Sequence, residues 1–204
     1  MKKLIALLLV TVMCLSMSGC ALILNLAKQG AEEITTETDV IYDDEAPVDD
    51  TPAVEETPEE ADPFEGLSFY SYDGVSLFME GGMVESEGEG FTVYSYSNTS
   101  MFAGIKEDAS VFTDAGLDIN DFTLEDYAEI VQNGNGLETP FTVDAAGNLS
   151  ATYNSNQNGT DFFYYATVKQ GTDAFWVFTF ACFAEDEALY LPQFQLWASS
   201  MVLD

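Results

Sequence analysis

Apolar and polar side chains alternate along much of residues 66–183, in short runs separated by turn residues. In the run 75–79 the odd positions hold Val, Leu and Met, whereas the even positions hold Ser and Phe. Successive side chains of a strand point to opposite faces, so this period of two predicts half-buried β-strands. The dipeptide Asp73-Gly74 favours a tight turn. We therefore expect an antiparallel hairpin that joins residues 67–72 to residues 75–79.

The same pattern predicts a series of later strands. The last of them, 174–183, is apolar on both faces apart from Thr179. A strand that is apolar on both faces is covered on both faces, so we expect it to lie in the centre of the sheet. Residues 107–121 and 155–159 are polar and rich in turn formers, which predicts loops there. The further predicted strands are 83–87, 91–97, 100–106, 141–143, 149–154 and 161–170.

Two segments have the periodicity of helices. Thr123 followed by Asp126 has the spacing of a capping box, and the apolar residues after it recur at helical intervals until Gly136. Near the chain end, Phe194, Trp197, Ala198 and Met201 form a stripe at i, i+3, i+4 and i+7, which predicts a helix that faces the core. Glu185-Asp186-Glu187 opens this helical region, and Pro192 fits the first turn of a helix.

The first residues have the pattern of an export signal. Lys2 and Lys3 precede an apolar run that ends at Leu15 and is too short to span a bilayer comfortably. The small residues directly before Cys20 resemble the lipobox of bacterial lipoproteins, although Met17 replaces the usual Leu, Val or Ile. The resemblance implies that 1–19 are removed as a signal peptide and that Cys20 receives the lipid. The alternative is an ordinary secretory signal cut before Cys20, which would then be a free thiol.

A lipobox also implies where the protein is found, namely the bacterial cell membrane, anchored by lipid on the extracytoplasmic side. Several acyl chains would hold it there firmly, because a single chain binds membranes only marginally. Residues 20–65 are rich in Glu, Asp, Thr, Pro and Ala, with few large apolar side chains. Such a composition predicts a disordered acidic linker. The patterned residues 66–204 are then one globular domain.

Charge excludes several classes of function. The chain has 36 acidic residues against five lysines, with no arginine and no histidine. Nucleic-acid binding needs a basic surface and is excluded, as is electrostatic binding to anionic lipid. Cys182 is the one cysteine left after Cys14 is removed and Cys20 is lipidated, so we expect no disulfide within the domain and a buried Cys182.

Candidate chemistry is sparse. Without histidine, Ser-His-Asp catalysis and histidine-ligated zinc are impossible. We therefore predict no enzyme activity, no catalytic residues, no cofactor and no metal site. The segment that begins at Asp118 has part of the spacing of a calcium loop, but Thr123 stands where such a loop needs glycine, so we interpret it as a capped helix entry. A pair of carboxylates acting as a hydrolase is the alternative that the residue types leave open.

The order of the predicted elements resembles the PsbP-like fold, in particular the bacterial DcrB/PsbP-like lipoproteins. The resemblance covers about residues 66–204 and rests on patterns of shape rather than on site motifs. It implies an α+β fold, an α/β/α sandwich around an antiparallel sheet flanked by helices. One departure is Glu80-Gly81-Gly82, where the family often has proline. The segments that carry the resemblance are Tyr72–Leu77, Thr123–Tyr127, the aromatic hairpin 161–183 and Trp197–Met201.

Together these observations predict a non-enzymatic lipoprotein, an accessory or binding module whose partner is a protein or a component of the cell envelope. A sugar- or cation-binding surface module is the second hypothesis, and a carboxylate-dependent hydrolase is the third. Besides Cys20, no residue can be assigned a chemical role from the sequence.

Overall fold

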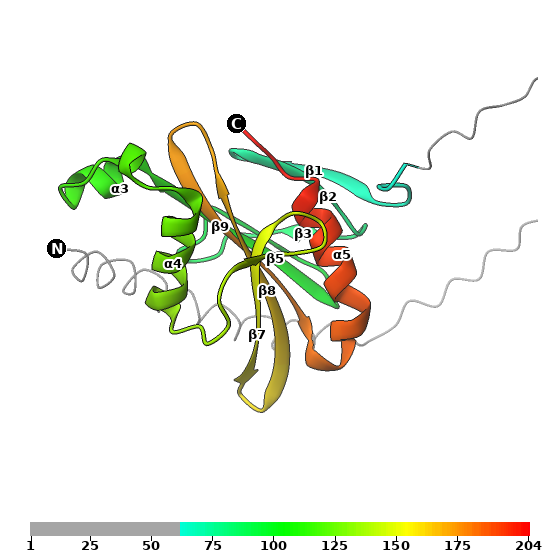
Figure 1. The fold of residues 1–204 in the computed structure, drawn as a ribbon. Helices are drawn as coiled ribbons and strands as arrows, with labels where there is room; N and C mark the ends of the chain where they lie inside the picture. Colours follow the sequence, from blue (N-terminus) through cyan, green and yellow to red (C-terminus); the bar gives the residue numbers. More distant parts are fainter. Residues whose placement is uncertain (1–61) are drawn as a thin grey trace, which may run out of the picture.

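The computed structural model describes residues 62–204. The predicted signal peptide 1–19, the lipid-attachment residue Cys20 and the predicted linker up to residue 61 lie outside the described residues. Within the described part, the fold is α+β, with antiparallel sheets and helices on both faces of the larger sheet (Figure 1). None of the helices in this part of the chain is long and apolar enough to cross a membrane.

The larger sheet has seven strands in the order β3-β4-β5-β9-β8-β7-β6. Strand β9 (Ala174–Phe183) pairs along its length with β5 (Ser100–Asp108) on one side and with β8 (Thr160–Gln170) on the other. Its place in the middle confirms the prediction made from its two apolar faces. The remaining strands are β3 (Val84–Glu85), β4 (Val93–Tyr96), β6 (Thr142–Val143) and β7 (Leu149–Gln157).

A second, three-stranded sheet has the order β1-β2-β10. The predicted hairpin is confirmed as β1 (Ser68–Tyr72) and β2 (Val75–Met79), and Gly74 in its turn adopts a φ of 81° that favours glycine. The third strand, β10 (Val202–Leu203), is the end of the chain paired with β2. This strand was not predicted, because two residues are too few to show a period.

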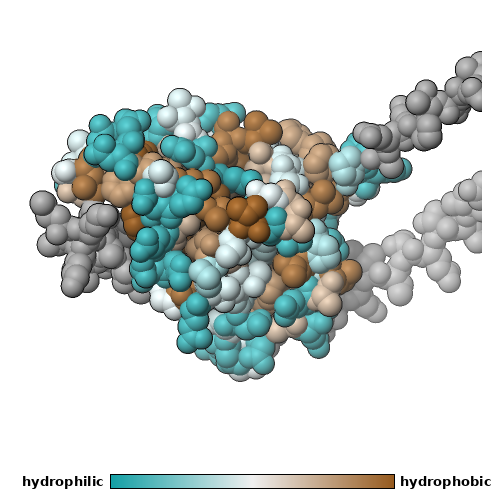
Figure 2. All heavy atoms as spheres, in the orientation of Figure 1, coloured by the Kyte–Doolittle hydropathy of each residue, from teal (hydrophilic) through white to brown (hydrophobic). Residues whose placement is uncertain are grey.

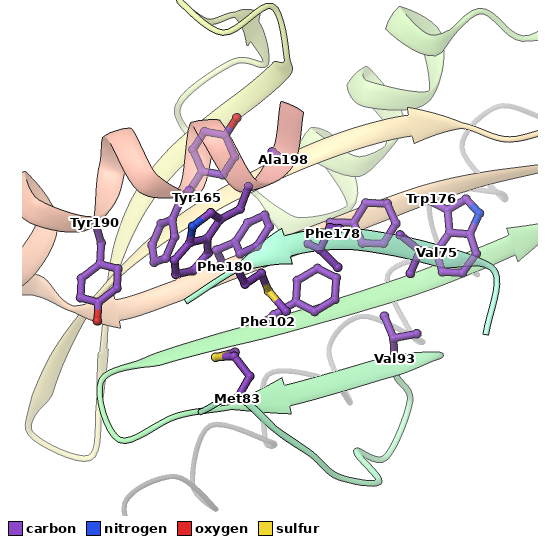
Figure 3. Packing of buried hydrophobic residues seen from close by; sticks show 14 of the residues in the cluster. Val75, Met83, Val93, Phe102, Tyr165, Trp176, Phe178, Phe180, Tyr190 and Ala198 are labelled. Atoms are coloured by element: carbon purple, nitrogen blue, oxygen red, sulfur yellow. The ribbon is translucent and has the colours of Figure 1, made fainter. Parts of the chain in front are cut away.

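One face of the larger sheet packs against α5 (Glu187–Ser199) and the inner side of β2. Trp176, Phe178 and Phe180 point from β9 into this layer, where they meet Val75 of β2 and Ala198 of α5 (Figure 3). The predicted helical stripe is confirmed for Phe194, Trp197 and Ala198, which are fully buried, whereas Met201 lies beyond the end of α5 and is partly buried against the same core. This layer is the main hydrophobic core.

The opposite face of the sheet packs against α4 (Leu124–Asn135). Tyr127 stacks on Phe175 of β9 with their ring centroids 4.7 Å apart. The predicted capping box is confirmed: Thr123 Oγ1 accepts the Asp126 N–H, and an Asp126 carboxylate oxygen accepts the Thr123 N–H. The helix ends at Gly136, whose left-handed φ of 63° makes it the C-cap.

The prediction of a loop over 107–121 was wrong. Strand β5 runs on to Asp108, and this segment then forms the short helix α3 (Ala109–Asp114) and the 3-10 turn η2 (Ile119–Asp121). Helix α3 has neither a side-chain cap nor an acidic first turn. Burial of Phe112 against Phe175 holds it instead, and no local signal in the sequence reports that contact.

The predicted loop 155–159 was also wrong, because β7 continues to Gln157. Asn158 and Gly159 alone make the turn into β8, with positive φ values of 55° and 91°. Asn-Gly is the preferred pair for a tight hairpin turn, since it tolerates positive φ at both positions. The polar residues before it belong to a long solvent-facing strand.

Pro192 was wrongly expected in the first turn of the last helix. The predicted opening of the helical region at 185–187 is confirmed, because the 3-10 turn η3 (Ala184–Asp186) leads directly into α5 at Glu187. Pro192 therefore lies inside the helix. A proline there lacks the N–H that would bond to the carbonyl of Ala188. The earlier start buries Tyr190, whose ring lies 5.3 Å from that of Phe194.

Candidate functional site

An open cleft of about 530 Å³ lies beside β7. Its size falls within the range of small ligand sites, about 300–1,000 Å³. It is bounded by the end of α4 and the loop after it, by the middle of β7, and by the first residue of α5. The residues that line it are Asn135, Gly136, Leu137, Glu138, Thr139, Thr152, Tyr153, Asn154, Ser155, Phe163 and Glu187.

The strand that forms the cleft wall is open along one side. Strand β6 pairs only with Leu149 and Ser150 of β7. From Ala151 to Gln157, β7 therefore has β8 on one side and no strand of the described residues on the other. Along this edge, the outward backbone groups of Thr152, Asn154 and Asn156 have no ladder partner among the strands of residues 62–204.

The cleft is acidic. Glu138 follows α4 and is exposed, whereas Glu187 opens α5 and is half-buried. The other lining side chains carry hydroxyl, amide, aromatic or aliphatic groups, and none carries a positive charge. A cleft with two glutamates and no basic side chain attracts cations or hydrogen-bonding neutral molecules and repels anions.

The hydrophilic end of the β7–β8 hairpin projects from the body of the molecule (Figures 1 and 2).

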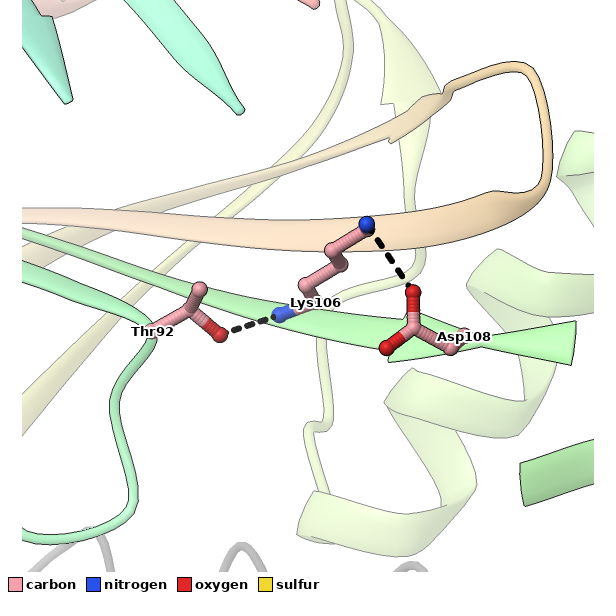
Figure 4. Close-up of polar contacts among 3 residues, drawn as sticks. All are labelled: Thr92, Lys106 and Asp108. Atoms are coloured by element: carbon pink, nitrogen blue, oxygen red, sulfur yellow. Dashed lines mark hydrogen bonds and ion pairs between the residues drawn. The ribbon is translucent and has the colours of Figure 1, made fainter. Parts of the chain in front are cut away.

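Neither lysine of residues 62–204 lines the cleft. Lys106 Nζ lies 3.0 Å from Asp108 Oδ1, and its backbone N–H donates to Thr92 Oγ1 (Figure 4). The hydrogen bond to Asp108 raises the pKa of Lys106. Lys169 donates to Asn148 Oδ1 over 2.9 Å, and its partial burial lowers its pKa. Both lysines are thus engaged with neighbouring residues.

A hydrogen-bond network around Asp144 fixes the turn between β6 and β7. Its Oδ1 accepts the N–H groups of Ala146 and Asn148, and its Oδ2 accepts the Tyr165 hydroxyl over 2.6 Å. Burial opposes ionisation of Asp144, but these hydrogen bonds outweigh it and lower its pKa. The Asn148 amide also donates to the Gln195 carbonyl of α5 over 3.0 Å. This network is a structural support at the start of β7.

Glu107 is a second unusual carboxylate, but it is inaccessible. It projects from β5 beneath α4 and is only 4% exposed. Its Oε2 and the neighbouring Tyr127 hydroxyl lack a hydrogen bond of ordinary geometry. Burial raises the pKa of Glu107 from 4.5 to about 7. Because both side chains are buried, we expect this pair to affect stability.

The other residues singled out from the sequence have structural roles. Cys182 is buried as predicted, and burial raises its pKa to about 12, which makes it an unreactive thiol. Asp118 Oδ1 accepts the backbone N–H of Asn120, so it caps the turn η2. Among residues 62–204, no three His, Cys, Asp or Glu side chains form a group that could hold a metal. Cys20 lies outside the described residues.

Sequence reasoning missed the cleft because its walls come from positions far apart, between Asn135 and Glu187. The glutamates belong to an excess of acids in which no pair stands out. The Asn158-Gly159 turn was the available signal. If Asn158-Gly159 is interpreted as the turn of a β-hairpin, β7 is predicted to continue to Gln157. It is then longer than the short strand β6, and part of its edge is left open.

No known protein family matches this chain, and no curated protein matches its sequence. A Bacteroides thetaiotaomicron protein of solved structure is 12% identical with a TM-score of 0.43, over 64% of this chain and 45% of that protein. The chain thus spans less than half the length of that protein. Cyanobacterial PsbP (CyanoP) from Synechocystis is also 12% identical, with a TM-score of 0.41, over 74% of this chain and 99% of PsbP. Similarities this distant carry no information about ligand or partner.

Proposed function

We propose that this chain is a non-enzymatic binding protein, anchored by lipid on the extracytoplasmic side of a bacterial membrane, that binds a positively charged ligand in the cleft beside β7. The cleft carries the proposal: two glutamates line a hollow of ligand size that has no basic side chain. The lipobox-like sequence before Cys20 supports the location. The absence of histidine and arginine from the chain supports a binding role over catalysis.

The charge of the cleft can be tested in the full chain carrying Cys20→Ser, which removes the residue predicted to receive the lipid. Spermine is a suitable probe because it is a small polycation. We expect spermine to raise the melting temperature, and the double change Glu138→Gln with Glu187→Gln to remove most of that rise. The effect should weaken as salt increases, because the cleft is open to solvent.

A matched control has the same change in charge outside the cleft. Glu125→Gln with Glu129→Gln alters two exposed residues of α4 that do not line the cleft. This control also accounts for spermine that binds the acidic residues elsewhere in the chain. Equal loss of the spermine effect in both double variants would mean that the cleft has no special role.

Sugar binding is the second candidate, and a specific observation favours it. The hydroxyl and amide groups of Thr139, Thr152 and Asn154 line the cleft beside an aromatic residue, Tyr153. Neutral sugars are held by such groups. A glycan panel read by binding and by hydrolysis separates the possibilities. Binding without hydrolysis would favour a sugar module, whereas turnover abolished by Glu138→Gln or Glu187→Gln would favour the carboxylate hydrolase.

A further inference from the structure

The open edge of β7 narrows the class of ligand, and this inference rests on the proposed function of the cleft. Strand β7 is nine residues long, but its outer neighbour β6 has only two. Thr152 and Asn154, which line the cleft, lie beyond the last residue that pairs with β6. The cleft therefore runs beside backbone as well as beside side chains.

The register of the hairpin shows which backbone groups face the cleft. A two-residue turn places Gln157 and Thr160 in a hydrogen-bonded pair. Such pairs alternate along an antiparallel ladder with pairs that are not hydrogen-bonded. Counting back from Gln157, the N–H and C=O groups of Thr152, Asn154 and Asn156 point away from β8. They are directed toward the open side of the strand.

Natural sheets commonly protect such an edge with lysine, proline, a bulge or a covering element. The segment Ala151–Gln157 contains neither lysine nor proline, and its pairing with β8 is continuous. The loop after α4 does not cover the edge, because the cleft separates residues 136–139 from the strand. The outward backbone groups thus have room for a partner chain.

The glutamates indicate what side chains that partner carries. Helix α5, which begins at Glu187, covers one face of the sheet, whereas Glu138 follows α4, which covers the other. Side chains of an added strand alternate between the two faces. The side chains on one face of the added strand would meet Glu187, and those on the other face would meet Glu138. Basic side chains are therefore favoured, and acidic side chains are repelled.

We propose that an extended peptide segment containing lysine or arginine binds the cleft as an added strand on the open edge of β7. Backbone hydrogen bonds to Thr152 and Asn154 hold the segment, and Glu138 and Glu187 select its charge. This is strand addition to a sheet edge, in which the main chain supplies affinity and the side chains supply specificity.

The test uses the full chain with Cys20→Ser and a labelled synthetic peptide of about eight residues, the length of a typical strand. The peptide repeats Lys-Lys-Val-Val, which places lysine on both faces of a strand, and a second version is N-methylated at every residue, so that neither of its edges keeps a backbone donor. N-methylation removes backbone donors but leaves every charge in place. We expect it to weaken binding about 10-fold or more, the loss expected when two or more hydrogen bonds are not made.

A pair of variants tests the same contact from the protein side. Asn154→Pro removes an outward N–H, which makes no bond to β8, and proline is tolerated on an edge strand at such a position. Asn154→Ala removes the side chain but keeps the N–H. We expect Asn154→Pro to weaken binding of the unmethylated peptide about 10-fold or more, and clearly more than Asn154→Ala does, because only the proline variant lacks the N–H.

Amide hydrogen exchange gives a readout that needs no variant. Peptide binding should slow exchange at Thr152, Asn154 and Asn156 in the unmodified cleft. Equal binding of the two peptides, with exchange unchanged, would overturn strand addition and leave the proposed binding of cations standing. If the protein with an unaltered cleft bound neither spermine nor the peptide, both the proposed binding of cations and the proposed strand addition would be overturned. Strong binding that survives Glu138→Gln with Glu187→Gln would overturn the selection of basic residues.

Discussion

Glu107 is the residue whose surroundings conflict most with its chemistry. Its carboxyl group lies in the apolar layer beneath α4, where no basic side chain of the described residues reaches it. Burial of a carboxylate disfavours the ionised form, so the folded protein holds its proton up to about pH 7. The unfolded chain releases the same proton near pH 4.5. This difference makes the free energy of unfolding depend on pH.

Whether stability rises or falls with pH follows from the number of protons that the folded and the unfolded states bind. Between pH 4.5 and about 7 the folded state binds the extra proton, so stability falls as pH rises through this window. Replacement of Glu107 by glutamine removes the penalty. We expect Glu107→Gln to be up to about 3 kcal/mol more stable than the unaltered protein at pH 8, and similar to it near pH 4.5.

Urea unfolding of the two proteins at both pH values measures this difference. Exposed acids of the chain contribute equally to both proteins and cancel. The matched control is Glu129→Gln on the exposed side of α4, for which the difference should stay within about 0.5 kcal/mol at either pH. A gain for Glu107→Gln that is the same at both pH values would show that ionisation of Glu107 is not its cause.

At the scale of the element, α5 depends on the tight packing of a few aromatic rings. Trp197 is fully buried, and its ring centroid lies 5.4 Å from that of Phe194 and 6.0 Å from that of Phe180. Its indole N–H has no hydrogen-bond partner. The residue therefore contributes through its volume rather than through its polar group.

Truncation of this ring should cost a large share of the stability of the domain. We expect Trp197→Ala to lower the free energy of unfolding by about 3–5 kcal/mol, out of a total of about 5–15 kcal/mol for a typical domain. Trp197→Phe keeps an aromatic ring and loses no hydrogen bond, so it should cost clearly less. A melting temperature that Trp197→Ala shifts by only a degree or two would show that α5 does not hold the core.

Elements with strong local signals were predictable from the sequence. The capping box at Thr123 and the both-face-apolar strand Ala174–Phe183 depend on neighbouring residues alone, and both are present as expected. Helix α3 and strand β10 have no such signal, because α3 is held by Phe112 and β10 by its pairing with β2. The cleft was beyond prediction for the same reason, since its walls meet only when the chain is folded.

At the scale of the whole molecule, the leader and the domain give separate predictions. Cys20 lies outside the described residues, so lipidation remains a prediction from its resemblance to a lipobox. We expect Cys20→Ser to move the protein from the membrane fraction to the soluble fraction. Cys14→Ser, which alters the other cysteine of the leader and not the one predicted to receive the lipid, serves as a comparison that should leave the protein in the membrane fraction. A Cys20→Ser protein that still carries lipid and sediments with membranes would contradict the assignment.

Both ends of the domain are fastened to the small sheet. Phe64, next to the predicted end of the linker, stacks on Phe78 of β2 with ring centroids 5.0 Å apart. The last residue, Asp204, donates its N–H to the Gly74 carbonyl. If the chain is held at Cys20, a pull along the linker enters the domain through β1. That outer strand is five residues long and is joined to β2 alone. Under mechanical load the β1–β2 hairpin would therefore separate from the domain first. The cleft beside β7 would keep its shape until the hairpin had separated.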